Sequence, residues 1–379
     1  MPSVADCLRQ HGPVYLKTFG DHVPLGHRKV LSAITRCRTG ELGGVVYECQ
    51  RCGREHWVGR SCGNRHCPTC GIDKTASWLE KQTTKLLPIE HFLITFTVPW
   101  ELRRVIRAHQ AVCYEAMFQC SSETIRELAS NPKWLGTCKL GFFGVLQTWG
   151  RDLTNYHPHI HFVVPGGGIS DDGNRWLSTA AGFFFPEACG SPIIRGKMRD
   201  AFAAAGLKDQ VDPKIWLHDK WWEVDVKAVG DGRAVLKYLA PYVYRVAISD
   251  KRIEACDESG VRFRYTPSGS NVSKTRTLTG NQFVGGFLQH VLPSGWKKIR
   301  YYGWMSSNSR VKLDEVKWLV WLYLGWRFWL ASGHAPQEEP LEREPVRCAA
   351  CGGEMRIVAI VNENCRTLVE HSVAYLDSG

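Results

Sequence analysis

The stretch HPHIHFVV, residues 157 to 164, places three histidines at alternate positions and then continues into an apolar run. Side chains of a β-strand point alternately to opposite faces of the sheet. His159 and His161 therefore share one face, whereas Ile160 and Phe162 share the other. The stretch predicts a strand that buries its apolar face in a core and presents its imidazoles on the other face.

Segments on both sides of this strand predict a sheet combined with helices. HFLITFTVP (91–99) alternates aromatic and β-branched residues up to a proline, as strands do. GFFGVLQTW (141–149) is also strand-like, and nine residues with Asn, Asp and Pro separate it from 159–165, which predicts an antiparallel hairpin. The fold class expected is α+β with a central antiparallel sheet. Further strands are predicted at 221–229 and 261–266, helical segments at 73–87, 100–130 and 280–293, and a helical or irregular arm at 1–30.

The chain has 379 residues, which is enough for two or three domains. Its formal net charge is +11 and its isoelectric point is near 9.0. This excess of Lys and Arg favours a polyanionic partner, because each neutralised phosphate releases condensed counterions. Nucleic acid is the expected partner, and an acidic membrane surface is the alternative.

The beginning of the chain and its most apolar run bear on localisation. MPSVADCLRQHGPVY lacks the apolar segment of a signal peptide, so a cytoplasmic location is expected. WLVWLYLGWRFWL (318–330) contains Arg327 and is shorter than the roughly 20 residues of a membrane span. It predicts a buried, Trp-rich helix and no membrane partner.

Fifteen cysteines without an export signal indicate metal binding rather than a disulfide framework. Two Cys-x2-Cys pairs with fourteen residues between them predict one four-thiolate Zn²⁺ site, formed by Cys49, Cys52, Cys67 and Cys70. The same region contains enough other ligands for a second Zn²⁺, with exchange between the two sets left open: Cys37, His56, Cys62 and His66. Near the end of the chain Cys348-x2-Cys351 forms half a site, which Cys365 and His371 are available to complete.

The imidazole face of the histidine strand predicts a second kind of metal site. Residues i and i+2 of a strand lie about 7 Å apart at Cα, close enough for His159 and His161 to hold one divalent ion. Gln147 in the preceding strand is the expected third ligand. Such a site leaves coordination positions open and suits Mg²⁺ or Mn²⁺ acting as a Lewis acid on a phosphodiester. Two alternatives remain open: ordinary strand histidines, and the pattern of histidine-triad nucleotide hydrolases, which would include His157.

Two tyrosines offer a nucleophile for such a metal site. Tyr238 and Tyr242 in KYLAPYVYR are four residues apart, which on a helix places them on one face about 6 Å from each other. A phenolate that attacks DNA keeps the ester energy in a phosphotyrosine link. The alternative is that both tyrosines are core residues. Pro241 between them would kink or begin a helix, so one nucleophile or two are both open.

A segment rich in cations and rings predicts a surface for single-stranded DNA. In such surfaces cations follow the backbone and rings stack on bases. The alternative is an aromatic strand with a charged, solvated face. The predicted DNA-binding residues in WKKIRYYGW (296–304) are Trp296, Lys297, Lys298, Arg300 and Tyr301.

Taken together, these motifs resemble the HUH-superfamily rolling-circle transposases of the insertion-sequence ninety-one type. The resemblance spans most of the chain and includes SCGNRHCPTCG (61–71), HFLITFTVPWELR (91–103), LQTWGRDLTNYHPHIHFVVPGGG (146–168), KYLAPYVYRVAISDKRI (237–253) and HVLPSGWKKIRYYG (290–303). It implies an enzyme that cleaves and transfers single-stranded DNA through a 5′-phosphotyrosine. His159 and His161 would be the histidine pair of its metal site, with Gln147 as third ligand, and Tyr238 and Tyr242 its two tyrosines.

The resemblance also implies a domain order and a set of competing functions. We expect an N-terminal arm and zinc-binding domain (1–88), a tyrosine nuclease domain (89–310), and a Trp-rich helix, linker and CxxC tail (311–379). Single-stranded DNA of transposon ends and target would be the partner. A rolling-circle replication initiator or a relaxase would use the same chemistry, and a zinc-containing DNA-binding regulator would cleave nothing.

Overall fold

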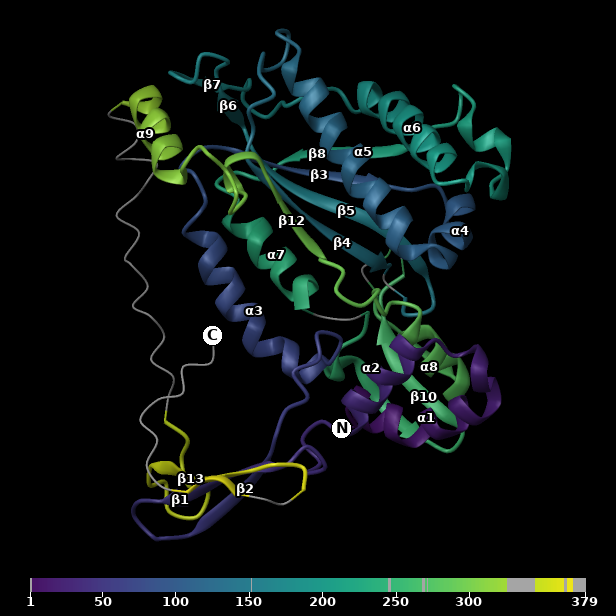
Figure 1. Ribbon diagram of the computed structural model, residues 1–379, viewed down its shortest axis with the longest axis vertical. Helices are drawn as coiled ribbons and strands as arrows, with labels where there is room; N and C mark the ends of the chain where they lie inside the picture. The colour runs from purple at the N-terminus through teal and green to yellow at the C-terminus, as the bar shows by residue number, and fades with distance from the viewer. Residues whose placement is uncertain are drawn as a thin grey trace.

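The computed structural model describes residues 2–150, 152–244, 247–267, 270, 272–325, 345–364 and 367–370. Its largest part is a sheet with helices on both faces, and two smaller parts lie below it in Figure 1. One of these contains α1, α2, α8 and β10, and the other contains β1, β2 and β13. The α+β class expected from the sequence is confirmed.

The central sheet has five strands in the order β12-β4-β5-β3-β8, and every neighbouring pair is antiparallel. β4 and β5 form the predicted hairpin, and the histidine stretch lies in β5, with a neighbour on each side. The strands are β3 (His91–Thr97), β4 (Phe142–Trp149), β5 (Tyr156–Pro165), β8 (Glu223–Ala228) and β12 (Ile299–Tyr302).

Helices cover the two faces of this sheet differently, as Figure 1 shows. Ile160 and Phe162 of β5 are fully buried in the core formed with α5 and α6. Val163 points the other way and packs with Trp78 of α3 and Leu239 of α7. The alternation predicted for the histidine stretch is therefore present, and the imidazoles face the α3 and α7 side. The helices are α3 (Pro68–Thr83), α4 (Arg103–Ala108), α5 (Gln110–Ser130), α6 (Glu187–Ala204) and α7 (Arg233–Tyr244).

Residues 4–35 form two packed helices with a short 3-10 turn between them. α1 begins with a capping box in which Ser3 and Asp6 each bond the other's backbone N–H. Its apolar side shares a core with α8 and a three-stranded sheet of order β11-β10-β9. The N-terminal region thus packs on residues that follow it by more than 200 positions. The elements are α1 (Val4–Phe19), α2 (Leu25–Thr35), α8 (Gly280–Leu288), β9 (Ile253–Asp257), β10 (Gly260–Tyr265) and β11 (Lys274–Leu278).

A separate four-stranded sheet combines the two ends of the chain in the order β14-β13-β1-β2. β13 runs antiparallel to β1 from Gly44 opposite Val361 to Cys49 opposite Met355. The segment after residue 345, which the sequence placed in a tail of its own, thus lies beside the zinc-binding region, where Figure 1 draws it in yellow. The strands are β1 (Gly44–Cys49), β2 (Glu55–Gly59), β13 (Met355–Val361) and β14 (Thr367–Glu370).

A small hairpin and α9 complete the upper part of the molecule. Val316 and Val320 of α9 are buried against Trp176 and Trp304, whereas Trp318 is 58% exposed. The prediction of a buried Trp-rich helix is thus wrong for α9, because only one side of it contacts the protein; residues 326–330 of that run lie outside the described residues. No helix in the described part of the chain has both the length and the apolarity that crossing a membrane requires. The elements are β6 (Gly167–Ile169), β7 (Trp176–Ser178) and α9 (Leu313–Leu324), and short 3-10 turns occur at Gly20–His22, Trp100–Leu102, Lys208–Gln210, Pro213–Trp216, Asp250–Arg252 and Gly303–Met305.

Candidate metal, tyrosine and zinc sites

The β4–β5 hairpin brings Gln147 opposite His159. The Oε1 of Gln147 lies 3.2 Å from the Nε2 of His159. The other ring nitrogen of His159, Nδ1, donates to the backbone carbonyl of His157 at 2.7 Å. Because Nδ1 carries the proton, Nε2 of the neutral ring presents a lone pair. Two acceptor atoms therefore point at the same place on the α7 side of the sheet.

This arrangement fits a divalent cation. Adjacent ligands of an octahedral ion with bonds of about 2.1 Å lie about 3 Å apart, close to the separation of the two acceptors. In this orientation of the amide, the Nε2 of Gln147 is buried without a hydrogen-bond partner among the described residues. Its oxygen thus takes the position that a hard cation requires.

His161 stands beside His159 and is oriented by a neighbouring strand. Thr95 of β3 lies opposite His161, and its Oγ1 is 2.9 Å from the Nδ1 of that ring. When this Nδ1 donates to Thr95, the Nε2 of His161 is left to bind a cation. The ring centroids of His159 and His161 are 4.8 Å apart, with the rings at 90°. His157 differs, because its Nδ1 accepts a hydrogen bond from the guanidinium of Arg103.

Burial keeps these imidazoles neutral. His159 and His161 are each 8% exposed. Desolvation lowers the pKa of His159 to about 4 and moves the pKa of His161 well below its ordinary value. A neutral imidazole is the form that binds metal ions.

Tyr238 extends from α7 toward this site. Its ring centroid lies 6.3 Å from that of His161, and the side chain is 49% exposed. α7 is helical through Pro241 to Tyr244, so Tyr242 lies one turn beyond Tyr238; the side chain of Tyr242 is outside the described residues. The helix therefore does not begin at Pro241, which was one of the two effects expected of that residue. Tyr244 is half-buried, and burial raises the pKa of its hydroxyl.

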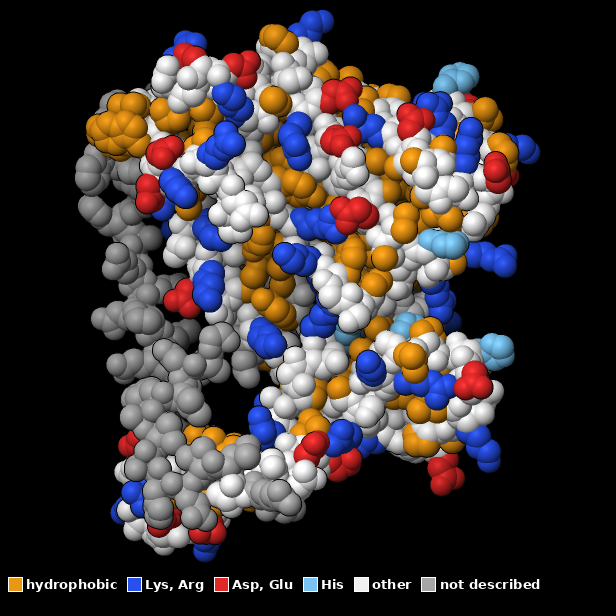
Figure 2. Space-filling model, in the orientation of Figure 1, with side chains coloured by type: hydrophobic (Ala, Val, Ile, Leu, Met, Phe, Trp, Pro, Cys, Tyr) orange, Lys and Arg blue, Asp and Glu red, His pale blue; other side chains and the backbone are white. Residues whose placement is uncertain are grey.

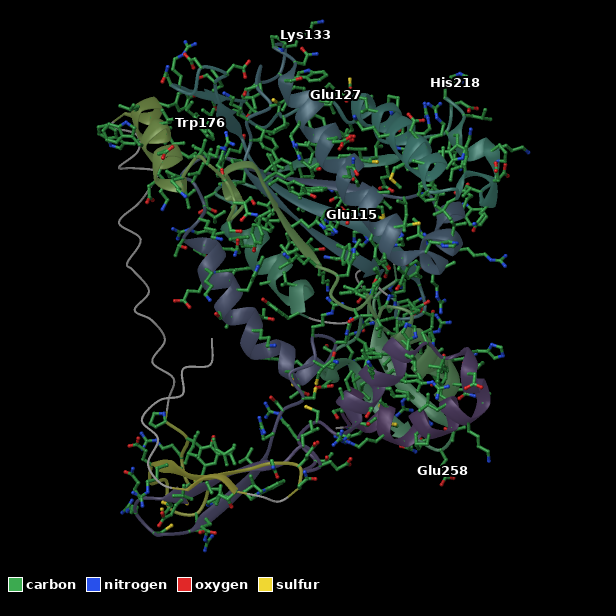
Figure 3. The ribbon with its side chains drawn as sticks, viewed as in Figure 1. Glu115, Glu127, Lys133, Trp176, His218 and Glu258 are labelled. Carbon is green, nitrogen blue, oxygen red and sulfur yellow. The ribbon has the colours of Figure 1, made fainter. Side chains whose placement is uncertain are left out.

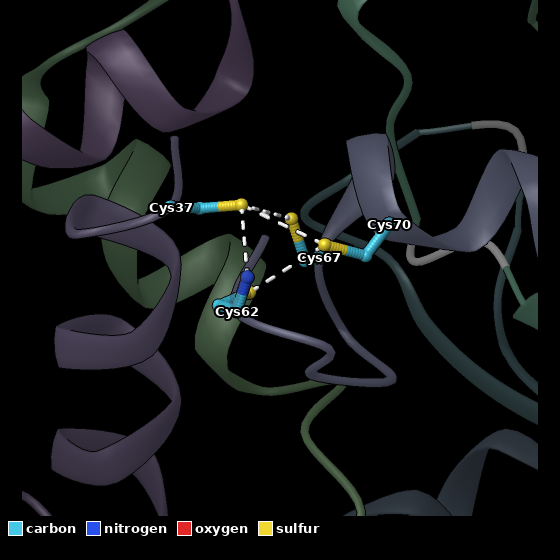
Figure 4. A group of neighbouring side chains, drawn as sticks. All are labelled: Cys37, Cys62, Cys67 and Cys70. Carbon is cyan, nitrogen blue, oxygen red and sulfur yellow. Dashed lines mark hydrogen bonds between the residues drawn. The ribbon is translucent and has the colours of Figure 1, made fainter. Parts of the chain in front are cut away.

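One group of four cysteines lies where α2, α3 and the segment between them meet. The Sγ of Cys37 lies 3.6 Å from that of Cys70 and 3.8 Å from that of Cys67, and Cys62 and Cys70 are 3.7 Å apart. Figure 4 shows the four sulfurs converging on one point. Thiolates at about 2.3 Å from a tetrahedral Zn²⁺ lie about 3.8 Å from one another, so this cluster has the dimensions of a structural zinc site.

The second group consists of Cys49, Cys52, Cys348 and Cys351. The sequence interpretation joined Cys49 and Cys52 to Cys67 and Cys70, and the structure corrects it. β1 and β2 form a hairpin that carries the first pair away, whereas Cys67 caps the N-terminus of α3.

The two histidines proposed as zinc ligands lie outside both cysteine groups. The Nε2 of His66 accepts a hydrogen bond from the backbone N–H of Leu292 at 3.1 Å, whereas the Nε2 of His56 lies 3.5 Å from the Sγ of Cys348. Cys365 and His371, considered as partners for the tail pair, are outside the described residues.

The residues predicted to bind DNA serve several purposes. Arg300 forms a two-pronged ion pair with Glu115 of α5, at 2.6 and 2.7 Å; Glu115 is labelled in Figure 3. The guanidinium of Arg300 also lies over the ring of Trp296, at 5.1 Å from its centroid. The hydroxyl of Tyr301 accepts a hydrogen bond from Trp78. Intramolecular contacts therefore account for Arg300 and Tyr301, while Lys297 is exposed.

Lys298 and Trp296 border a pocket of about 360 Å³ between β4, the end of α7 and the loop at Arg65. The Nζ of Lys298 lies 4.4 Å from the ring centroid of Trp149, and burial lowers its pKa to about 7. Arg65 donates to the carbonyl of Pro293 at 2.6 Å. Trp149 was not predicted as a site residue, because nothing in its local sequence pattern places it beside Lys298. On the face shown in Figure 2, Lys and Arg side chains gather around the region where α3 and β12 lie in Figure 1.

Comparison with known proteins places the chain among the transposases. A family model described as "Putative transposase" matches residues 141–312, and another described as "Transposase zinc-binding domain" matches residues 7–98. The chain is 36% identical to the "Putative transposase y4qJ" of Sinorhizobium fredii (strain NBRC 101917 / NGR234), over 82% of this chain and 81% of the relative. It is 23% identical to the "Transposase for insertion sequence element IS801" of Pseudomonas savastanoi pv. phaseolicola, over 88% of this chain and 84% of the relative.

These matches define the family as well as the class. The chain belongs to the transposases of the insertion-sequence ninety-one type, as the resemblance implied, and it has their zinc-binding domain. The cluster of Cys37, Cys62, Cys67 and Cys70 lies within this domain and supports structural zinc there. No solved structure matches the chain.

Proposed function

We propose that this transposase cleaves and joins single-stranded DNA, with a divalent cation held by His159, His161 and Gln147 and with Tyr238 or Tyr242 as the nucleophile. The observation that carries the proposal is the meeting of three groups on one face of the sheet. The Oε1 of Gln147 lies 3.2 Å from the Nε2 of His159, and the ring of Tyr238 lies 6.3 Å from the ring of His161.

The chemistry follows from this arrangement. The phenolic oxygen attacks the scissile phosphorus, the bond to the 3′ oxygen breaks, and the DNA leaves a 5′-phosphotyrosine and a 3′-hydroxyl. The phenol loses its proton and the departing 3′ oxygen gains one. A bound Mg²⁺ or Mn²⁺ would supply Lewis-acid stabilisation of charge on the phosphate oxygens. The 3′-hydroxyl of a second strand then attacks the phosphotyrosine and restores a phosphodiester.

The residues of the chain hold this site in place before substrate binds. Thr95 and the His157 carbonyl orient the two imidazoles through their Nδ1 atoms. Tyr238 is half-exposed, so a DNA strand can reach its side chain from solvent. The two groups that orient the imidazoles thus lie on β3 and β5 rather than in loops, which favours a fixed position for both rings.

The basic pocket supports a path for the DNA next to the reacting groups. Trp149 lies two residues after Gln147 in β4, and Tyr244 follows Tyr238 in α7, so the pocket adjoins the proposed cleavage site. Arg65 and the protonated form of Lys298 supply positive charge beside the rings of Trp149 and Trp296. This combination is typical of surfaces that bind single strands.

Zinc has a structural role in this proposal. Four thiolates around one ion fill its coordination sphere and leave no position for substrate. The cluster of Cys37, Cys62, Cys67 and Cys70 stands at the start of α3, which packs along α7. It therefore supports α7, the helix that carries Tyr238 and Tyr242, and takes no part in cleavage or joining of DNA.

The test is a covalent-adduct assay with a labelled single-stranded oligonucleotide from the element's end and Mg²⁺. His159→Ala should abolish cleavage, and either Tyr238→Phe or Tyr242→Phe should abolish the adduct while the strand still binds. Tyr323→Phe is the matched control, because Tyr323 of α9 is 52% exposed, like Tyr238, and lies on another part of the molecule. An adduct that persists in both single tyrosine variants and in their double variant would refute the proposed nucleophile.

The same assay separates transposition from related activities. Joining of a cleaved end to a second, unrelated strand is expected of a transposase, and the family of this chain favours that outcome. A replication initiator or relaxase would return the strand to its own origin. A DNA-binding regulator would form no adduct.

A further inference from the structure

The second cysteine group combines two segments that lie about 300 residues apart in the sequence. Cys49 and Cys52 stand at the end of β1, whereas Cys348 and Cys351 precede β13. The four sulfurs lie within 4.8 Å of one another. The Sγ of Cys49 is 3.5 Å from that of Cys351, and the Sγ of Cys52 is 3.8 Å from that of Cys348. These separations match the spacing of about 3.8 Å between thiolates on one tetrahedral zinc ion.

The backbone of the two pairs is the same, which is a second observation that points to metal. In the first pair, the N–H of Gly53 donates to the carbonyl of Cys49 at 2.9 Å, and the N–H of Cys49 donates to the carbonyl of Arg54 at 3.0 Å. The second pair repeats both bonds: the N–H of Gly352 donates to the carbonyl of Cys348, and the N–H of Cys348 donates to the carbonyl of Gly353, each at 2.8 Å.

A glycine with positive φ ends each of these turns. The φ angles are 68° at Gly53 and 71° at Gly352. A glycine adopts this left-handed conformation at little cost, which lets the chain turn back immediately after the second cysteine. Two matching turns that face each other are the arrangement in which zinc ribbons hold their ion.

The strands next to these turns hold the tail in register. β13 pairs with β1 along its whole length, and Arg356 forms an ion pair with Glu48 at 3.1 Å across the two strands. A Cβ added at Gly43 would lie 2.2 Å from the carbonyl oxygen of Val361. The two segments therefore also approach closely at the end of β1 that is remote from the cysteines. The tail is thus a part of the zinc-binding sheet.

We propose that Cys49, Cys52, Cys348 and Cys351 bind a second structural Zn²⁺ that joins the beginning of this transposase to its end. Cys348 and Cys351 lie outside both matched family segments, which end at residues 98 and 312. β1 and β2 alone would be a two-stranded hairpin, and such hairpins are marginally stable in water. The strand β13, about 300 residues further along the chain, therefore completes the sheet that carries Cys49 and Cys52.

The test is zinc content per chain in the full-length protein, purified under reducing conditions and measured by mass spectrometry of the metal. Wild type should hold two Zn²⁺. The double variants Cys49→Ser/Cys52→Ser and Cys348→Ser/Cys351→Ser should each hold one, and the variant that combines all four changes should still hold one. Cys138→Ser/Cys189→Ser, which alters cysteines outside both clusters, should hold two.

Further variants make the count unambiguous. Cys62→Ser/Cys70→Ser removes the other cluster and should also leave one ion, and its combination with Cys348→Ser/Cys351→Ser should leave none. The retained ion in each double variant shows that the other cluster is still folded. Two zinc ions in Cys348→Ser/Cys351→Ser, or a single ion in wild type with a Cys49–Cys351 disulfide in the intact mass, would overturn the proposal.

Proteolysis gives an independent measurement. With a protease site inserted between residues 325 and 345, the released C-terminal piece should remain with the rest of the wild-type protein on gel filtration. It should separate after zinc is removed with a chelator and in the Cys348→Ser/Cys351→Ser variant. Separation from the zinc-loaded wild type would also refute the proposed joint.

Discussion

The hydrogen bond from His161 to Thr95 allows the proposed metal site to be tested without touching a ligand. Thr95→Val keeps the shape of the side chain and removes its oxygen, so the imidazole loses the partner at Nδ1, 2.9 Å away. A hydrogen bond of this kind contributes about 0.5–1.5 kcal/mol, and the freed ring must also be reoriented on binding. Outer partners of metal-binding histidines typically account for 10–100-fold in affinity, about 1.4–2.7 kcal/mol.

The assay is a Mn²⁺ titration of adduct formation on the single-stranded oligonucleotide. For Thr95→Val the half-saturating Mn²⁺ concentration should rise roughly 10–100-fold, and the rate at saturating Mn²⁺ should approach that of wild type. Thr97→Val is the matched control, because Thr97 lies opposite His159 on the same strand, and His159 takes its Nδ1 bond from the His157 carbonyl instead. Its titration should stay within about threefold of wild type.

Two outcomes would show that the reasoning is wrong. If Thr95→Val and wild type require the same Mn²⁺ concentration, His161 does not bind the ion through Nε2 with Thr95 as its support. If the rate of adduct formation by Thr95→Val stays below that of wild type at every Mn²⁺ concentration, Thr95 acts on the fold or on the chemical step rather than on metal affinity.

Three further predictions concern packing, charge and pH. Gly144→Ala should lower the free energy of unfolding by about 1–3 kcal/mol in chemical denaturation, because the added Cβ would lie 2.5 Å from the ring of Phe162. Gly196→Ala on α6 is the control: there is open space around Gly196, so this change should leave the free energy of unfolding unchanged or raise it by up to about 1 kcal/mol. Lys298→Met should remove a fall in single-strand affinity between about pH 6 and 8, since burial holds the lysine pKa at about 7 and only the protonated form below that pH attracts phosphate. Arg300→Met should cost about 1 kcal/mol of stability in thermal unfolding and leave single-strand affinity unchanged, and a large loss of affinity would contradict its intramolecular role.

Local patterns were sufficient for the three middle strands of the central sheet. The alternation at 91–99 and 157–164 and the strand-like composition of 141–149 predicted β3, β5 and β4, and the loop between 141–149 and 159–165 predicted their antiparallel pairing. The same reasoning placed Gln147 near His159, because a hairpin brings the end of its first strand beside the start of its second.

Distant pairing explains what the sequence could not predict. The spacing of Cys49, Cys52, Cys67 and Cys70 is compatible with one zinc site or with two, and the choice depends on where β13 pairs. Ligands from segments about 300 residues apart leave no local signal. The intramolecular partners of Arg300 and Tyr301 could not be predicted for a similar reason, because Glu115 and Trp78 lie on distant helices.

The helix α3 connects two features that are otherwise remote from each other. Cys67 caps its start and Cys70 lies in its first turn, while Trp78 further along packs in the same cluster as Leu239 of the tyrosine helix. Beside Cys70, a Cβ on Gly71 would lie 2.4 Å from the carbonyl oxygen of Tyr244, so the two helices also touch at the cysteine end. Oxidation of Cys67 or Cys70 would therefore displace α3 and, through these contacts, α7 with its tyrosines. We expect such oxidation to lower activity although the cysteines take no part in the reaction.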